Sequence, residues 1–132
     1  MPRGAVPEQY HDILASAALG HLATIGRDGR PQVNPVWFLS DGQHVYLSLK
    51  PETVKYRNLR ATPAVALSVG DLARPDRYLE IRGEVVAFER YDTLVWVNQL
   101  AHKYTGVDFT GGRDGEPRDK VTIRIDAWTG QG

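Results

Sequence analysis

Apolar positions recur at two spacings along the chain, and the spacings separate helices from strands. At helical spacing they predict a first helix that Pro7 opens and Gly20 ends. A second helix is predicted over 53–61, ended by Pro63, and a third over 91–104. The apolar positions of the first helix are Tyr10, Ile13, Leu14, Ala17 and Ala18.

Alternating or continuous apolar runs predict strands in the rest of the chain. Three strands over 21–26, 31–39 and 44–49 are separated by the turn sequences "GRDG" and "SDGQ". Residues 64–70 and 78–88 form two more, and Gly83 marks a bulge or bend in the second. The last strand is "KVTIRIDAW", after a polar, glycine-rich loop at 105–119.

The order of these elements favours a mainly β fold with inserted helices. Short strands that follow one another directly favour antiparallel pairing, and such a set closes into a barrel or a curled sheet. We therefore predict a six-stranded barrel. With 132 residues, no repeat and no linker, the chain fits a single domain over residues 1–132.

Charge and composition narrow the range of partners. Lys+Arg and Asp+Glu are both 16, so no bulk field attracts the chain to nucleic acid or to a membrane surface. Cysteine is absent, which excludes disulfides and thiolate chemistry. No apolar stretch approaches the roughly 20 residues of a membrane span, and no signal peptide is recognisable. We expect a soluble, cytoplasmic protein.

Motifs for catalysis by side chains are missing. The four histidines are scattered without metal-ligand spacing, so no metal site is expected. Ser68 lies in "ALSVG", which is not a nucleophile elbow, and no Walker or dinucleotide motif is present. An enzyme of this kind would depend on a cofactor for its chemistry.

The segment 50–60 concentrates positive charge. Lys50, Lys55, Arg57 and Arg60 face only Glu52. Thr53 stands where the second helix begins, so its hydroxyl can cap that helix, and a helix N-terminus next to a lysine is a ready anion site. The segment predicts either a phosphate site or a solvated basic helix.

A second unusual stretch is "PQVNPVWF", residues 31–38. Gln32 and Asn34 share one face of the strand, and Pro35 cannot donate to a sheet ladder. Backbone groups, amide side chains and the ring of Trp37 offer a place for a heteroaromatic ring. The alternative is that Pro35 marks an edge strand and Trp37 belongs to the core.

Both stretches lie within "HLATIGRDGRPQVNPVWFLSDGQHVYLSLKPETVKYRNLRATPAVALSV". With "YLEIRGEV", "AHKYTG" and "VTIRI" in the same order, the chain resembles the split-β-barrel proteins related to pyridoxamine-phosphate oxidase. It is most similar to their actinobacterial branch, which uses the deazaflavin coenzyme F420. The resemblance covers about residues 12 to 128.

The resemblance implies a homodimer with two cofactor clefts at the subunit interface. Thr53 and Lys55 would hold the cofactor phosphate, with Arg57 and Asn58 nearby. Gln32, Asn34, Val36 and Trp37 would run along the ring. Lys50 and Arg60 would meet the acidic tail of the deazaflavin, and Tyr78 would reach the cofactor of the partner chain.

The implied activity is hydride transfer from reduced F420 to an unsaturated small molecule, with Tyr78 as a candidate proton donor. One alternative is an FMN-binding reductase or oxidase on the same barrel. Another is a non-catalytic module that binds a cofactor or a tetrapyrrole. The last strand is followed only by "TGQG", whereas oxidases of pyridoxamine phosphate carry a C-terminal extension, so we do not expect that oxidase activity.

Overall fold

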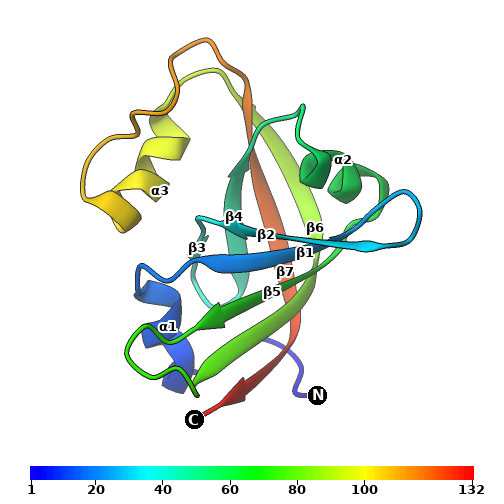
Figure 1. Ribbon diagram of the computed structural model, residues 1–132, viewed down its shortest axis with the longest axis vertical. Helices are drawn as coiled ribbons and strands as arrows, with labels where there is room; N and C mark the ends of the chain where they lie inside the picture. Colours follow the sequence, from blue (N-terminus) through cyan, green and yellow to red (C-terminus); the bar gives the residue numbers. More distant parts are fainter.

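Seven antiparallel strands form one curled sheet, a half-barrel, in the computed structural model, which describes residues 1–132 (Figure 1). Their order in the sheet is β2-β1-β5-β6-β7-β4-β3. The strands are β1 (Gly20–Ile25), β2 (Pro31–Val36), β3 (Leu39–Ser40), β4 (His44–Leu49), β5 (Ala64–Gly70), β6 (Tyr78–Tyr91) and β7 (Arg118–Gln131).

The predicted strand 31–39 is divided, which gives seven strands where six were expected. β2 ends at Val36, and β3 begins at Leu39 on the opposite edge of the sheet. The backbone of Phe38 bonds to side chains between them: its N–H donates to Tyr104 Oη at 3.2 Å, and its carbonyl accepts from Lys103 Nζ at 2.9 Å. Because these two side chains of the third helix satisfy the backbone groups of Phe38, Trp37 and Phe38 do not pair with a neighbouring strand.

The two longest strands, β6 and β7, hold the centre of the sheet. Each is longer than its prediction, and they pair from Tyr78 with Gln131 to Tyr91 with Arg118. Their register shifts at Arg82/Gly83, which confirms the bulge predicted at Gly83. A Cβ at Gly83 would lie 1.9 Å from the carbonyl oxygen of Arg124, so only glycine fits this approach of two backbones.

Three helices flank the sheet (Figure 1). They are α1 (His11–Ala15), preceded by a 3-10 turn at Glu8–Tyr10, α2 (Val54–Ala61) and α3 (Val95–Thr105). The first is shorter than predicted because Ser16 takes an extended conformation that stops it. The third starts later than predicted because β6 continues to Tyr91. None of the helices has the length and apolar character needed to cross a bilayer.

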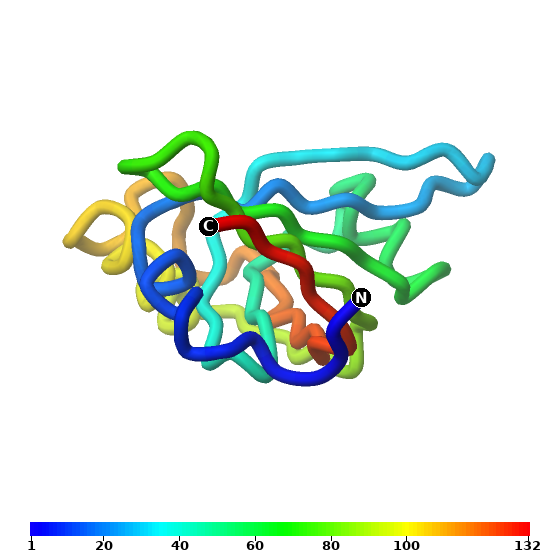
Figure 2. The backbone as a smooth tube through the Cα atoms, turned by 90° about the horizontal axis from the view of Figure 1, so that it is seen from below, coloured from blue at the N-terminus to red at the C-terminus, as the bar shows by residue number.

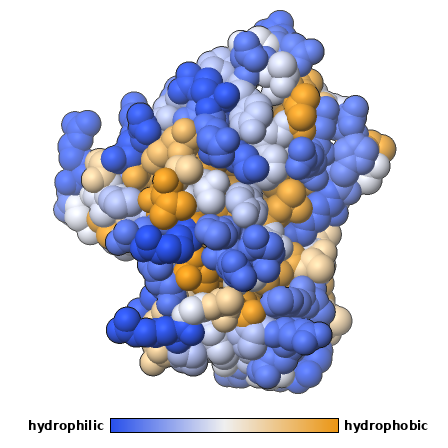
Figure 3. All heavy atoms as spheres, turned by 180° about the vertical axis from the view of Figure 1, so that it is seen from behind, coloured by the Kyte–Doolittle hydropathy of each residue, from blue (hydrophilic) through white to orange (hydrophobic).

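A core of 21 buried residues lies inside the curl, and Phe38, Val45, Leu47, Leu79 and Val121 in it are fully buried. The β1–β2 hairpin projects from this body (Figure 2). Val33 on that hairpin is 60% exposed, and Ile25 is 39% exposed. Apolar residues also reach the surface elsewhere, as patches among polar groups on the face shown in Figure 3.

A buried arginine ties α1 to the turn before β6. Arg77 is 8% exposed and donates to both carboxylate oxygens of Asp12, at 2.7 and 2.9 Å, and to Asp71 at 2.9 Å. These hydrogen bonds hold the pKa of Asp12 and that of Asp71 below the usual value of 3.8. The two carboxylates therefore stabilise the fold only while they are ionised.

We expect Gly83→Ala to lower the free energy of unfolding by about 2 kcal/mol or more, because the added methyl group collides with backbone that cannot move aside. Gly70→Ala is the matched control, since a Cβ there meets no atom within 4 Å, and it should change the free energy by less than about 0.5 kcal/mol. Urea unfolding of both variants measures the difference. Equal stability of the two variants would contradict the close approach at Gly83.

Arg77→Met should destabilise the protein at pH 7 and reduce its sensitivity to acid. The folded-state pKa values of Asp12 and Asp71 are depressed, so their stabilisation is present above about pH 4 and is lost as the pH falls below it. The stability difference between wild type and variant should therefore be largest near neutral pH and narrow below pH 3.8. Chemical denaturation from pH 7 to pH 2.5 tests this, with exposed Arg74→Met as control. A difference that stays constant over the range would refute it.

Candidate functional site

The N-terminus of α2 is open to an anion. Thr53 occupies the N-cap with an extended backbone, but its hydroxyl donates to the carbonyl of Lys50 at 2.8 Å and does not cap the helix. The prediction that Thr53 caps α2 through its side chain is therefore wrong. The missing side-chain cap favours ligand binding, because the first N–H groups of such a helix are free to donate to a ligand.

Buried polar contacts fix α2 against the sheet. Tyr56 Oη donates to Asp119 Oδ2 at 2.6 Å, and the buried carboxylate of Asp119 also accepts from Arg90. Burial and the neighbouring carboxylate raise the pKa of Tyr56, so its hydroxyl remains a donor. On the other side, Asn58 Nδ2 donates to Thr24 Oγ1 at 3.1 Å and to Gln32 Oε1 at 3.4 Å. The helix is thus held from both β7 and the hairpin.

A pocket of about 330 Å³ brings the two unusual sequence stretches together. Pro35, Val36 and Trp37 from the end of β2 line it, and so does Lys55 from the first turn of α2. The remaining lining residues come from β4, α3, the loop after α3, the start of β7 and the segment before β1: Ser48, Leu49, Val97, Leu100, Phe109, Arg118 and Leu19. The strand that contains Pro35 and the basic segment that contains Lys55 therefore line the same pocket.

Aromatic stacking holds one wall of this pocket. The ring of Trp37 lies parallel to that of Tyr104, with centroids 5.3 Å apart and planes 5° apart, and Phe109 meets it edge-on at 6.0 Å. Tyr104 in turn donates to the carbonyl of Ala18 at 3.0 Å. Burial raises the pKa of Tyr104 to about 12 and lowers that of Lys103 to about 8. Trp37 is half-buried, and it forms a preorganised flat surface.

The edge-strand interpretation of Pro35 is also correct. β2 is the outermost strand of its side of the sheet, and Pro35 is exposed on it, opposite His21 of β1. A proline at this place costs no ladder hydrogen bond to a further strand. Pro35 therefore lies on an edge strand and also lines the pocket.

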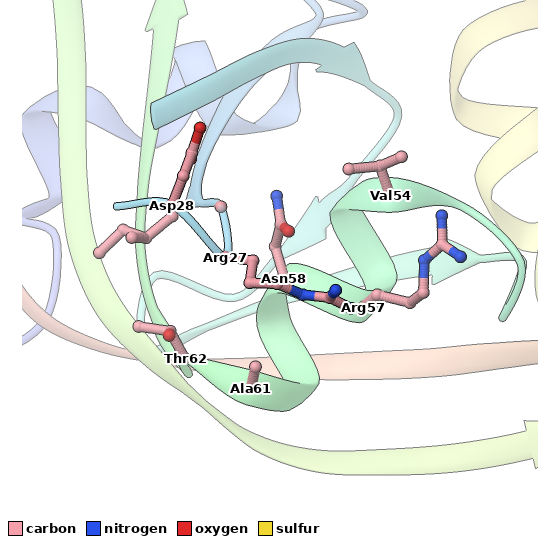
Figure 4. Close-up of a pocket in the computed structure, with 9 residues that line it drawn as sticks. Arg27, Asp28, Val54, Arg57, Asn58, Ala61 and Thr62 are labelled. Atoms are coloured by element: carbon pink, nitrogen blue, oxygen red, sulfur yellow. The ribbon is translucent and has the colours of Figure 1, made fainter. Parts of the chain in front are cut away.

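A larger open cleft lies on the other side of α2, between that helix and the β1–β2 hairpin (Figure 4). Its volume is about 970 Å³. Arg57 and Asn58 of the predicted set line it with Arg27 and Asp28 of the hairpin turn and with Val54. The cleft is lined by both α2 and the hairpin, and Val54 at its rim is 50% exposed.

Other residues of the predicted set lie elsewhere. Lys50 Nζ pairs with Glu116 at 3.3 Å, and the guanidinium of Arg60 lies over the ring of Phe88 at 4.6 Å. Asn34 is half-buried on β2, opposite Leu22, and it lines neither cleft. Tyr78 is opposite Gly70, at the end of β5 farthest from α2. Within one chain, the structure does not bring Tyr78 to the pocket.

The sequence interpretation missed half of the pocket. Ser48, Leu100, Phe109 and Arg118 come from β4, α3, the loop after α3 and the start of β7, and none of them belongs to the set predicted from the sequence. A possible signal was the alternation "RDK" before "VTIRI", which places Arg118 and Lys120 on one face if the strand begins early.

Comparisons with known proteins agree with this geometry. The family model described as Pyridoxamine 5'-phosphate oxidase matches residues 6–132. A solved structure named F420 reductase, from Mycobacterium smegmatis, is 39% identical, with a TM-score of 0.87 over 94% of this chain and 98% of that one. A search of curated proteins gave no match.

More distant structures share the fold. A conserved hypothetical protein from Mycobacterium tuberculosis is 24% identical, with a TM-score of 0.68 over 96% of this chain and 85% of that one. General Stress Protein 26 from Bacillus anthracis is 16% identical, with a TM-score of 0.69 over 93% and 91%. With its split-barrel sheet and its match over nearly the whole length, the chain belongs to the pyridoxamine 5'-phosphate oxidase family, whose fold serves flavin- and deazaflavin-related oxidoreductases.

Proposed function

We propose that this protein is a reductase that uses reduced coenzyme F420 to transfer hydride to an unsaturated small molecule. The observation that carries the proposal is the single pocket in which Lys55, from the first turn of a helix without a side-chain cap, meets Pro35, Val36 and Trp37. The 39% identical structure named F420 reductase supports the choice of cofactor.

The residues present fit a phosphorylated tricyclic cofactor. Lys55 forms no salt bridge, in contrast to Lys50, so its ammonium is free for a phosphate. The N–H groups of the first turn of α2 would add donors to the same group. The ring of Trp37, fixed by Tyr104, offers an apolar face for a flat heterocycle, and β2 beside it carries backbone groups on an open sheet edge.

The bound cofactor supplies the hydride. The chain itself supplies position and an apolar wall, to which Leu49, Val97 and Leu100 contribute. No nucleophile or metal ligand set is needed for such a reaction. The proton that must follow comes from solvent or from Tyr78 of a second chain, because Tyr78 lies far from the pocket of its own chain.

A second chain is part of this proposal. The β1–β2 hairpin projects from the body of the chain (Figure 2). Its exposed Ile25 and Val33, and the exposed Val54 that lines the larger cleft, offer apolar surface for a partner. A homodimer would cover these residues and add its own side chains to the two clefts. The cytoplasmic location stays a prediction.

Titration with F420 and with FMN tests the choice of cofactor. We expect F420 to bind more tightly than FMN, and the purified protein to be colourless. Fluorescence of each cofactor follows the binding, and oxidation of reduced F420 in the presence of enones, quinones or nitroaromatics follows turnover. Tight binding of FMN alone would favour the FMN-dependent alternative, and tight binding without turnover would favour a carrier module.

Lys55→Ala should weaken binding of F420 about 10- to 150-fold, because it removes one charge-assisted contact worth roughly 1.5–3 kcal/mol. Lys50→Ala is the matched control: it removes the same charge from the same segment, but that ammonium is already paired with Glu116. Fluorescence titration of both variants provides the comparison. If Lys55→Ala binds as tightly as wild type, the phosphate assignment is refuted.

A further inference from the structure

Arg118, the first residue of β7, is a buried cation. It is only 9% exposed, and its guanidinium lies over the ring of Phe109, 4.9 Å from the ring centroid. Burial lowers the pKa of Arg118, although a guanidinium remains charged at any physiological pH. A positive charge is therefore held in a mostly apolar surrounding.

Glu116 and Glu52 lie near enough to act on the charge of Arg118 through space, but neither forms a salt bridge with it. Glu116 pairs with Lys50 at 3.3 Å and with Arg113 at 3.5 Å. Asp119 points to the other face of the strand, where it accepts from Tyr56 and Arg90. Arg118 forms no salt bridge, and its Nε is buried without any hydrogen-bond partner.

An unpaired buried guanidinium lowers the stability of a folded protein unless something compensates it. The second buried polar atom without a partner is Ser48 Oγ, and it belongs to the same pocket. Only these two side-chain atoms in the chain are buried and unsatisfied. Two unsatisfied groups at one place indicate a ligand that the chain alone does not provide.

Lys55 is the third polar group of this pocket, and it too lacks a salt bridge. The other lining residues are apolar or proline. Two cations, one of them in the first turn of α2, and one hydroxyl match a phosphate group, which is anionic and has at least two terminal oxygens, better than they match a single carboxylate. The pocket therefore has the composition of a phosphate site with an apolar extension.

We propose that Arg118 is a second cation of the phosphate site, and that its guanidinium binds the same phosphate group as Lys55, beside the hydroxyl of Ser48. The identity of that phosphate as part of a deazaflavin rests on the proposed function, whereas the anion site itself does not. Arg118 is then a binding residue: it increases the affinity for the ligand and lowers the stability of the protein without ligand.

The test compares Arg118→Met with wild type in two measurements. The variant should bind F420 and FMN about 10-fold more weakly or worse, because a charge-assisted contact is lost. Its unfolding free energy without ligand should stay equal or rise, because an unpaired buried charge is replaced by an apolar side chain of similar length. Arg118→Lys should recover part of the affinity, and Arg74→Met, an exposed arginine far from the pocket, should change neither quantity.

A third measurement uses inorganic phosphate alone, followed by thermal unfolding. Phosphate should raise the melting temperature of wild type and raise that of Arg118→Met much less. If wild type binds FMN or phosphate but not F420, the proposed function fails. The affinities of wild type and Arg118→Met for FMN or phosphate then still test the role of Arg118. Equal affinity of Arg118→Met and wild type for every phosphate-bearing ligand overturns the proposal. A wild type that responds to none of them overturns it as well, and so does an unliganded variant that has lost stability while keeping its affinity.

Discussion

The anchoring of the Phe38 backbone by α3 is the contact on which the pocket depends. Phe38 is fully buried between two strands, where neither its N–H nor its carbonyl has a ladder partner. Tyr104 and Lys103 satisfy both groups, and Lys103 also donates to the carbonyl of Leu14 at 2.8 Å. Without Tyr104 as acceptor and Lys103 as donor, buried backbone groups would remain unpaired, at a cost of about 1–3 kcal/mol each. With them, the chain passes from one edge of the sheet to the other and leaves Trp37 facing the pocket.

The strands and their antiparallel order were predictable because alternation and turn residues agree with each other. The hairpin turns contain Gly29 and Gly42, both with positive φ, as the turn sequences indicate. The bulge at Gly83 was predictable as well, because a glycine interrupts a strand pattern there. The division of 31–39 was not predictable, because it results from side chains of a helix more than sixty residues later. No local pattern within "NPVWFLS" records that partner.

Only part of the candidate site could be predicted from the sequence. Clustering of Lys50, Lys55, Arg57 and Arg60 suggested one positive surface, but the fold distributes these residues. Glu116 pairs with Lys50, Phe88 covers Arg60, and Arg57 lies in the larger cleft, which leaves Lys55 alone in the pocket. The cation that joins Lys55 comes from the far end of the chain. Burial without an ion pair, and not local charge density, distinguishes Arg118 from the other arginines, because the equally buried Arg77 is paired with Asp12 and Asp71. Both burial and pairing depend on the whole fold.

The pair Lys103–Tyr104 gives this anchoring an unusual dependence on alkaline conditions. Burial lowers the pKa of Lys103 to about 8, from 10.5, so above pH 8 the unfolded chain holds a proton there that the folded chain has released. Stability from this group therefore rises with pH up to about 10.5. Tyr104, with a pKa raised from 10.0 to about 12, acts in the opposite direction above pH 10. Taken together, these two groups favour the anchored backbone of Phe38 most in mildly basic solution, above the pKa of Lys103 and below that of Tyr104.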